Sequence, residues 1–278
     1  MTRQNVGFLA SLVFLIFLPS ASLLGQTNCD EGDGSLKPAQ PAGITPNEII
    51  QRFAAKEAVF KQARNNYTYT QDATVQTLEG HAVDGEFREV TGITYDDKGN
   101  RQENVTFAPQ STLARVTLTR EDFDDIRHLL PFVLTTEDLA QYDILYAGSQ
   151  HVDEIDTYVF DVAPKRIEKD MRYFQGRIWV DTHDLQIVKT CGKSMRDVKP
   201  GGTGKDVHED LSPRFVTYRE QIDGQYWFPT YSRADEILHF TNGDIHIREI
   251  IKYTKYKRFG PKSRIIFNGE TPPNQKPK

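Results

Sequence analysis

Little in this sequence of 278 residues has the residue types and the spacing that a catalytic or metal site requires. The seven histidines are scattered, and no His-Glu-x-x-His pair of zinc ligands occurs. Gly201-Gly-Thr-Gly204-Lys205 looks like a phosphate-binding loop, but that motif needs Gly at position 199 and Ser or Thr at position 206. Those positions hold Lys199 and Asp206, so the glycines indicate a solvated loop. No Gly-x-Ser-x-Gly elbow of a serine hydrolase is present either.

The remaining candidates for chemistry are His239 and His246, which flank the Asn242-Gly243 turn with Asp244 nearby. Such hairpin side chains are more often exposed polar groups than metal ligands. Acidic pairs such as Asp153-Glu154 lie in turns, rather than in an apolar pocket that would separate their pKa values. We therefore expect no catalytic residue, no metal and no cofactor, and hence a protein that is not an enzyme. A secreted hydrolase would need acidic side chains clustered with His in a cleft.

The N-terminus has the features of an export signal. Arg3 gives it a positive start, residues 6–18 form an almost unbroken apolar run, and small residues follow near a cleavage site at about residue 26. The run is shorter than the ~20 residues of a membrane-spanning helix. We predict a signal peptide over residues 1–26, with an uncleaved anchor as the alternative. The mature protein is then periplasmic or otherwise secreted.

The two cysteines, Cys29 and Cys191, are the only ones in the chain. Export permits a disulfide between them, which would close a very long loop and attach the N-terminal leader to the strand that ends at Thr190. Nothing in their spacing decides between this disulfide and two unpaired thiols. Both alternatives therefore stay open at the level of the sequence.

Composition and charge exclude some classes of function. Lys and Arg number 34 against 39 Asp and Glu, and no basic stripe occurs, which argues against binding to nucleic acid or to anionic lipid surfaces. With 38% hydrophobic residues the chain can bury a core. Gly, Pro and acids over residues 27–43 predict a flexible leader, and prolines over residues 268–278 predict a disordered tail. One domain over residues 44–267 remains, which we expect to be monomeric.

Two helical elements are expected in this domain. Thr45-Pro46-Asn47-Glu48 combines a capping box with Pro at the first helical position, and apolar residues follow at helical spacing to about residue 64. A second helix start, Thr119-Arg-Glu-Asp122, opens an apolar insertion in which Pro131 limits any helix. We interpret this insertion as an internal helical lid and call it the lid segment (residues 120–140).

The rest of the chain alternates with period two, which predicts strands separated by turns such as Asp223-Gly224. No long helices alternate with these strands, so a parallel α/β sheet is not expected. A sheet of about ten strands curls rather than staying flat. The predicted fold is mainly β, a curled antiparallel sheet that forms an open half-barrel, with an N-terminal helix and an internal helical lid. The candidate strands cover residues 67–77, 85–95, 101–108, 113–118, 142–148, 157–162, 174–180, 185–192, 215–221, 227–234, 236–240 and 245–259.

One passage resembles a known family. Phe174-Gln-Gly176-Arg-Ile-Trp179-Val-Asp181 and the following Leu185-Gln-Ile187-Val-Lys189 are similar to the paired central strands of the outer-membrane lipoprotein-sorting carriers, the LolA/LolB-like superfamily. Gly224-Gln-Tyr226-Trp227-Phe-Pro229 resembles a later strand of that family. The order of signal peptide, helix, strands, lid and further strands is also the same. The motifs that carry the resemblance cover about thirty residues, and they are sequence patterns of β-hairpins.

The resemblance implies a soluble periplasmic carrier that holds a lipid or lipoprotein acyl chain beneath its helices and performs no chemistry. The expected partners are this hydrophobic ligand and, further, envelope proteins. The alternative is an envelope-stress sensor of the same fold that binds a protein partner; an open apolar cavity would favour the carrier, and a filled one the sensor. For the two tryptophans among the candidates, a position in the ordinary hydrophobic core is more common than one in the wall of a cavity. The candidates for the cavity or lid are Phe123, Ile126, Leu129, Leu130, Phe132, Trp179 and Trp227.

Overall fold

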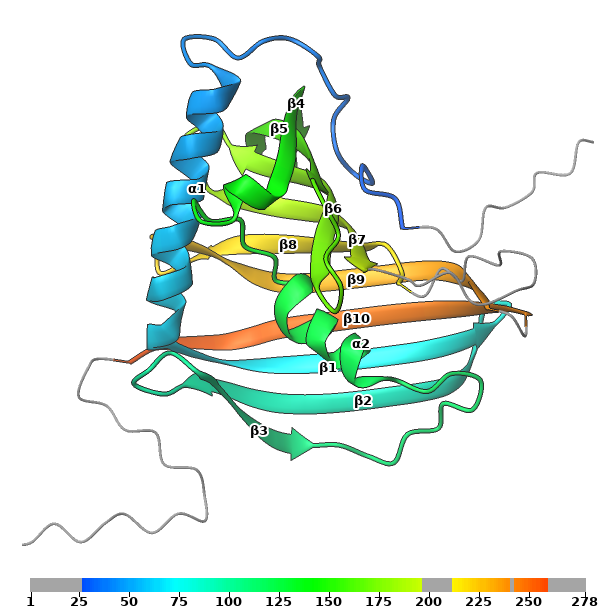
Figure 1. Ribbon diagram of the computed structural model, residues 1–278. Coiled ribbons are helices and arrows are strands. Elements are labelled where there is room, and N and C mark those ends of the chain that lie inside the picture. Colours follow the sequence, from blue (N-terminus) through cyan, green and yellow to red (C-terminus); the bar gives the residue numbers. More distant parts are fainter. Residues whose placement is uncertain (1–26, 197–211, 241–242, 260–278) are drawn as a thin grey trace, which may run out of the picture.

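The computed structural model describes residues 27–196, 212–240 and 243–259, which form one strongly curved antiparallel sheet with helical elements (Figure 1). The strands are β1 (Tyr67–Glu79), β2 (Ala82–Tyr95), β3 (Arg101–Phe107), β4 (Tyr142–Val152), β5 (Ile155–Pro164), β6 (Arg172–Asp181), β7 (Ile187–Arg196), β8 (Phe215–Ile222), β9 (Tyr226–Phe240) and β10 (Gly243–Arg258). Their order across the sheet is β3-β2-β1-β10-β9-β8-β7-β6-β5-β4. Because β3 and β4 are edges, the sheet is not closed into a barrel, and the predicted curled, open sheet is confirmed. The predicted signal peptide and tail lie outside the described residues.

Two strand predictions differ from the structure. The two strands expected within residues 227–240 form the single strand β9, because Asp235 between them stays paired with β10. Residues 113–118, predicted as a strand, join none of the ten strands. Val116 and Leu118 instead pack against buried side chains of β1, β9 and β10. The segment therefore crosses the face of the sheet, where its apolar side chains can be buried.

Helical elements precede and interrupt the strands. They are α1 (Pro46–Ala63), the 3₁₀ turn η1 (Arg64–Asn66), α2 (Arg120–Asp124), the π-helical turn η2 (Asp125–Leu129) and the 3₁₀ turn η3 (Leu139–Gln141). The predicted capping box of α1 is present: Glu48 N donates to Thr45 Oγ1 at 3.2 Å, and Thr45 N donates to Glu48 Oε2 at 2.9 Å. Ile49 and Phe53 of α1 are fully buried in the main core against the sheet.

The lid segment lies on the same concave face of the sheet as α1 (Figure 1). It begins at the second predicted capping box, in which Thr119 N donates to Asp122 Oδ2 at 2.7 Å. Its helical part is short, because Leu130 N donates to Asp125 O at 2.9 Å and Pro131, which follows, has no N–H for a further bond. The rest of the segment has no further α-helix: an irregular stretch is followed by turns and by η3, in agreement with the limit that Pro131 sets.

Residues 27–43, predicted as a flexible leader, contact the convex face of the sheet. Cys29 forms a disulfide with Cys191 of β7, so of the two alternatives the structure has the disulfide. Further along, the backbone of Lys37 pairs with that of Ser149 on β4. The leader therefore covers one end of the sheet instead of standing apart from it.

A buried ion pair also holds the leader. Lys189 Nζ lies 2.7 Å from Asp33 Oδ2 and 4.6 Å from the ring centre of Trp179. The Lys189 and Asp33 side chains are 0% and 3% exposed. A charge pair at this depth is tolerated because each partner neutralises the other.

Removing the disulfide should lower the free energy of unfolding by about 2–4 kcal/mol, because it frees a long loop in the unfolded chain. The two cysteines are 162 positions apart. Urea unfolding of the Cys29→Ser/Cys191→Ser variant, compared with the oxidised wild type, measures the effect. Unfolding the wild type in a reductant is the control and should give a similar shift. An unchanged midpoint in both would contradict the prediction.

Candidate functional site

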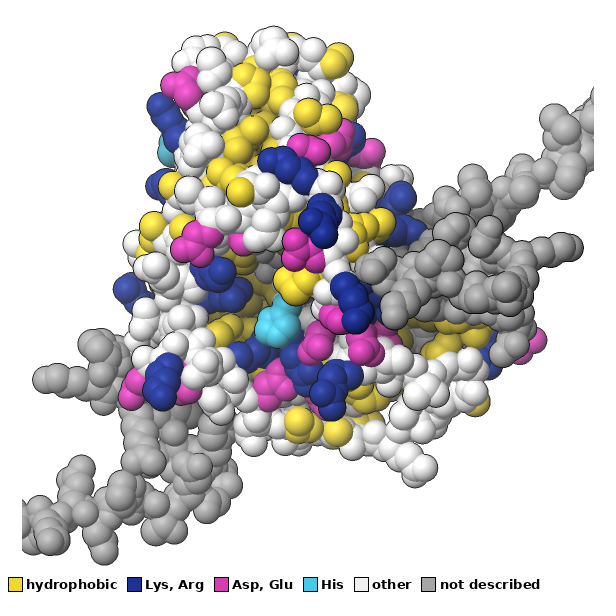
Figure 2. Space-filling model, in the orientation of Figure 1, with side chains coloured by type: hydrophobic (Ala, Val, Ile, Leu, Met, Phe, Trp, Pro, Cys, Tyr) yellow, Lys and Arg dark blue, Asp and Glu magenta, His cyan; other side chains and the backbone are white. Residues whose placement is uncertain are grey.

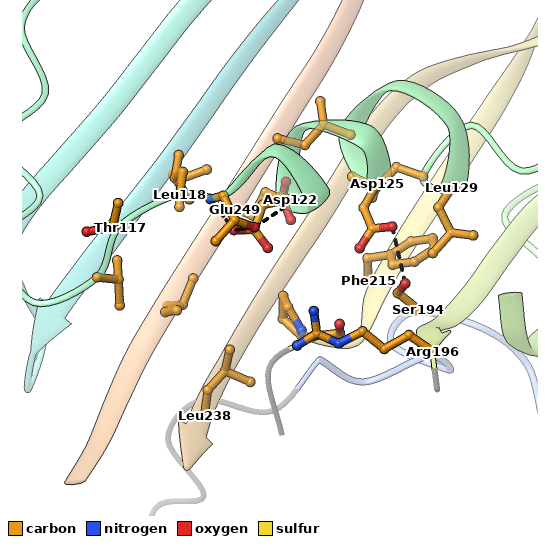
Figure 3. A pocket seen from close by; sticks show the side chains of 18 of the residues that line it. Thr117, Leu118, Asp122, Asp125, Leu129, Ser194, Arg196, Phe215, Leu238 and Glu249 are labelled. Carbon is orange, nitrogen blue, oxygen red and sulfur yellow. Dashed lines mark hydrogen bonds between the residues drawn. The ribbon is translucent and has the colours of Figure 1, made fainter. Parts of the chain in front are cut away.

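A pocket of about 320 Å³ lies between the lid segment and the concave face of the sheet (Figure 3). Its walls come from α2, η2, the chain before α2, and strands β1, β7, β8, β9 and β10. The apolar part of the wall includes Val75, Leu118, Ile126, Leu129, Leu130, Phe215, Leu238 and Ile247. The polar part includes Arg115, Asp122, Asp125, Ser194, Arg196 and Glu249. The pocket is thus apolar with a few charged groups on its wall.

Strand alternation produces the apolar wall. Val75 on β1, Leu238 on β9 and Ile247 on β10 point to the same face and form one buried cluster. Val116 and Leu118 pack against this cluster from the segment that crosses the sheet. The space between these residues and the short lid helices is the pocket.

Asp125, the first residue of η2, contacts two strands beside the pocket. Its Oδ1 accepts a hydrogen bond from Ser194 Oγ of β7 at 3.2 Å, and its Oδ2 accepts one from Arg172 of β6. Arg172 also donates to Ser194 Oγ at 3.0 Å. Burial raises the pKa of Asp125 to about 6, and the nearby Arg172 opposes this rise. These contacts attach the lid segment to the sheet on one side of the pocket.

Glu249 is the least expected side chain of the pocket. It lies on β10 between Ile247 and Ile251, at an inward position of the strand, and is 8% exposed. Burial raises the pKa of Glu249 to about 8, with smaller contributions from the charges of Asp125 and Asp122. The carboxyl is therefore mostly protonated at neutral pH. Sequence reasoning missed this residue, although an acid among the apolar residues of one strand face was a visible signal.

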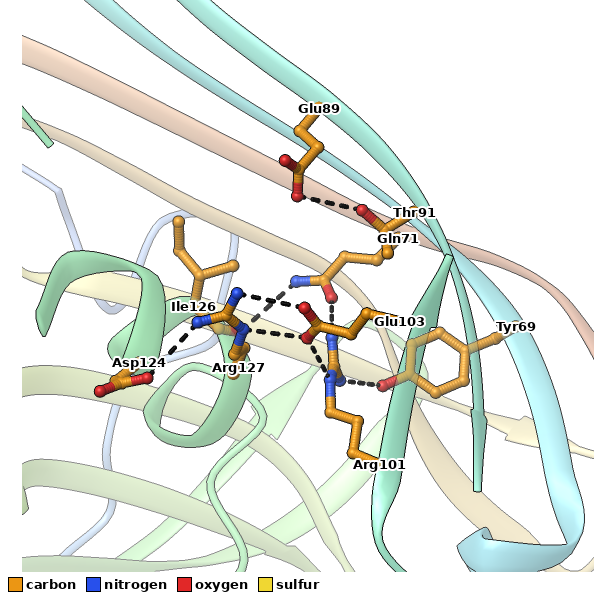
Figure 4. A network of polar contacts seen from close by, with 9 residues as sticks. All are labelled: Tyr69, Gln71, Glu89, Thr91, Arg101, Glu103, Asp124, Ile126 and Arg127. Atoms are coloured by element: carbon orange, nitrogen blue, oxygen red, sulfur yellow. Dashed lines mark hydrogen bonds and ion pairs between the residues drawn. The ribbon is translucent and has the colours of Figure 1, made fainter. Parts of the chain in front are cut away.

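A polar network attaches the lid segment to the sheet on its other side (Figure 4). Arg127 of η2 donates to both Oε atoms of Glu103 on β3, at 2.9 and 3.1 Å. Arg101 donates to Glu103 Oε1 at 2.8 Å and to Gln71 Oε1 of β1 at 2.5 Å. The network thus joins η2, the edge strand β3 and β1. This network could not be predicted from the sequence, because its members come from three separate elements.

The structure separates the seven candidate residues. Ile126, Leu129 and Leu130 line the pocket. Phe132 lies beyond it in the main core, stacked on Phe174 with ring centres 4.3 Å apart. The chain after Pro131 therefore fills core instead of covering the pocket.

The other three candidates also lie outside the pocket. Phe123 packs edge-on against Phe87, with ring centres 5.5 Å apart, next to the polar network. Trp179 is fully buried on the convex side, where its Nε1 donates to Gln150 Oε1 at 2.7 Å. Trp227 packs against the same convex cluster. The tryptophans lie there because alternation sends the neighbours of Trp179 on β6, and not Trp179 itself, into the concave core.

The two histidines that flank the β9–β10 turn do not form a common site. His239 Nδ1 lies 2.7 Å from Asp244 Oδ1, whereas His246 bonds to Asp235. Within the described residues, no group of three or more His, Cys, Asp or Glu side chains has the arrangement of a metal site. The helices in the same ranges are all too short or too polar to span a membrane. Charged side chains of both signs are interspersed on the face that carries the lid segment (Figure 2).

Comparison with known proteins identifies no family for this chain. No family model and no curated protein matches it. Among solved structures, a DUF1329 family protein from Desulfovibrio piger ATCC 29098 has a TM-score of 0.35 and 15% identity, covering 75% of this chain and 92% of that one. MucB has a TM-score of 0.23 and 12% identity, covering 72% and 93%, and MucB in complex with MucA(peri) has 0.22 and 10%, covering 76% and 99%. Because these TM-scores are below 0.5, we draw no conclusion from them, and the resemblance to the lipoprotein-sorting carriers stays a prediction.

Proposed function

We propose that this chain is an exported, non-enzymatic binding protein that holds a hydrophobic ligand, such as a lipid or an acyl chain, in the pocket beneath the lid segment. The observation that carries the proposal is the pocket itself, about 320 Å³ of space between apolar residues of the sheet and the lid. Ligand sites have volumes of roughly 300–1,000 Å³ and mostly apolar walls. Each CH₂ group buried there would contribute about 0.8 kcal/mol, so affinity should rise with chain length until the pocket is full.

The contacts that hold the lid segment fit such a role. The Arg127 and Glu103 side chains are 32% and 26% exposed, and an ion pair this accessible contributes about 1 kcal/mol or less. This attachment to β3 is therefore weak enough to break when a ligand enters and to re-form afterwards. We expect the lid segment to be displaced on loading from this side of the pocket.

Filling the pocket should weaken ligand binding. In the Val116→Trp variant an indole ring would occupy the space beside Leu118, so an uncharged fluorescent alkyl probe should bind at least about tenfold more weakly, the equivalent of about two CH₂ groups. A fluorescence titration measures the affinity. Leu145→Trp on β4 is the matched control, because Leu145 is 68% exposed and lies outside the pocket.

The wild type tests the proposed function directly. Protein purified from membranes should carry extractable lipid, and the probe should bind it with a saturable change in fluorescence. If neither is found, the pocket is not a lipid site. A protein partner would then be the better hypothesis for this fold.

A further inference from the structure

The carboxyl group of Glu249 lies on the wall of the pocket and has no hydrogen-bond partner among the described residues. The residue is 8% exposed and belongs to the pocket wall (Figure 3). Within the described part of the chain, no side chain donates a hydrogen bond to this carboxyl or pairs with it. A buried polar group that lacks a hydrogen-bond partner costs free energy. The position therefore points to a partner that a ligand supplies.

The groups that face Glu249 make its surroundings negative. Asp122 of α2 and Asp125 of η2 are the two charged residues that act on it, and both raise its pKa. The strands on either side contribute no charge there, since Val75 of β1 and Ala234 of β9 are its register partners. A positive group that entered the pocket would thus be attracted by Asp122 and by the ionised form of Glu249, whereas Asp125 is already paired with Arg172.

Among the described residues, none of the arginines in or beside the pocket pairs with Glu249. Arg172 of β6 is paired with Asp125. Arg115 Nη2 lies 2.6 Å from Asp84 Oδ2, so its charge is directed to the start of β2. Arg196, at the end of β7, extends into the pocket (Figure 3) but is not among the charged groups that act on Glu249. Among the described residues, the charges that act on this carboxyl are therefore those of the acids.

We propose that the pocket selects an amphiphile with a protonated amine, whose ammonium group binds at Glu249 and whose alkyl chain lies along Leu238 and Ile247. This inference rests on the proposed function and names the polar group of its ligand. An ammonium group has three N–H donors and no acceptor, which suits a carboxyl that receives no hydrogen bond from the described residues. The head of a fatty acid would instead place a negative charge beside Asp122 and Asp125. An alcohol offers a hydrogen bond without the charge.

The test compares three ligands with the same chain, decylamine, decanol and decanoate, by calorimetry at pH 7 and below their micelle concentrations. The wild type should bind decylamine at least about tenfold more tightly than the other two, because a charge-assisted hydrogen bond is about twice as strong as a neutral one. If decanol or decanoate binds as tightly as decylamine, the selection for an amine is wrong but the proposed function survives. If none of the three binds, the proposed function fails as well.

The variant Glu249→Gln keeps the shape of the side chain and removes its charge. It should lose about tenfold in decylamine affinity and leave decanol affinity within about threefold. Glu137→Gln is the matched control, since Glu137 is exposed and lies outside the pocket. Equal losses for decylamine and decanol in Glu249→Gln would overturn the proposal, because they would show only a damaged pocket.

Binding of decylamine should also release protons at pH 7. Since burial raises the pKa of Glu249 to about 8, the carboxyl is mostly protonated in the free protein and must ionise to pair with the ammonium group. The heat of binding should therefore change between buffers of different ionisation enthalpy. It should not change in this way for Glu249→Gln. Decylamine binding to the wild type without proton release would contradict the contact.

Discussion

Replacing Glu57 by Leu should lower the free energy of unfolding by about 3–5 kcal/mol, the usual effect of removing one partner from a buried ion pair. Both Oε atoms of Glu57 accept hydrogen bonds from Arg219 Nη1, at 3.0 and 3.1 Å, and each side chain is 1% exposed. The guanidinium group cannot lose its proton at any ordinary pH. The variant would therefore keep a buried positive charge with no counter-charge beside it.

The position of Arg219 extends this effect to the lid segment. Besides Glu57 on α1, Arg219 of β8 donates to Ile187 O of β7 at 3.4 Å and to Phe132 O in the lid segment. One side chain thus joins the N-terminal helix, two strands and the lid. We expect amide hydrogen exchange in the lid segment to become faster in Glu57→Leu than in the wild type.

The double variant Glu57→Leu/Arg219→Met shows how much of the loss in stability comes from the missing attraction and how much from the charge of Arg219 that is left buried and unpaired. Because it removes both charges, it should recover most of the stability that the single variant loses. Glu137→Leu, at an exposed position, is the surface control and should change stability by no more than about 0.5 kcal/mol. Urea unfolding measures all three variants. A loss below about 1 kcal/mol in Glu57→Leu would show that Arg219 finds another partner.

Features that depend on a few neighbouring residues could be predicted from the sequence. Thr45 with Glu48 and Thr119 with Asp122 form the expected capping boxes, since each box needs only residues three positions apart. Asp223-Gly224 forms the expected hairpin turn because both residues take positive φ, 56° and 71°. The strands could be predicted for the same reason, since the alternation of apolar and polar residues is visible within each strand. The number of such strands then predicted a curled sheet.

Features that depend on distant pairs could not be predicted. Gly, Pro and acids predicted a flexible leader, but the side chain of Asp33 is buried against Lys189, which lies 156 positions away. The candidate strand over residues 113–118 has suitable alternation, yet the segment joins none of the ten strands, and Val116 and Leu118 are partly buried against the face of the sheet. Aromatic residues suggested a lined cavity, but the position of Trp179 depends on which face of β6 turns inward. The sequence of one strand does not determine that choice.

The stability of the folded protein should fall by several kcal/mol as the pH rises from about 4.5 to about 8, because of Glu249. Its pKa is raised from 4.5 to about 8 by burial, so the folded state favours the protonated carboxyl. Below pH 4.5 both the folded and the unfolded state are protonated, and the contribution of Glu249 is fully present. As the pH rises further, only the unfolded state releases the proton readily, and the contribution is lost by about pH 8. At about 1.4 kcal/mol per pH unit, the loss is at most about 5 kcal/mol. Asp125, whose pKa burial raises to about 6, acts in the same direction over a narrower range.

Urea unfolding at several pH values between 5 and 8 measures this effect, with Glu249→Gln as the decisive comparison. The amide cannot ionise, so the variant should lose far less stability over this range and should exceed the wild type in stability at pH 8. Glu137→Gln should follow the wild type, because the side chain of Glu137 is exposed and lies outside the pocket. If the stability of the wild type and of Glu249→Gln changed in parallel with pH, the prediction would be wrong, and the carboxyl of Glu249 would be solvated in the folded protein. Saturating decylamine should reduce the loss in the wild type, since an ammonium group beside the ionised carboxyl removes the cause of its instability.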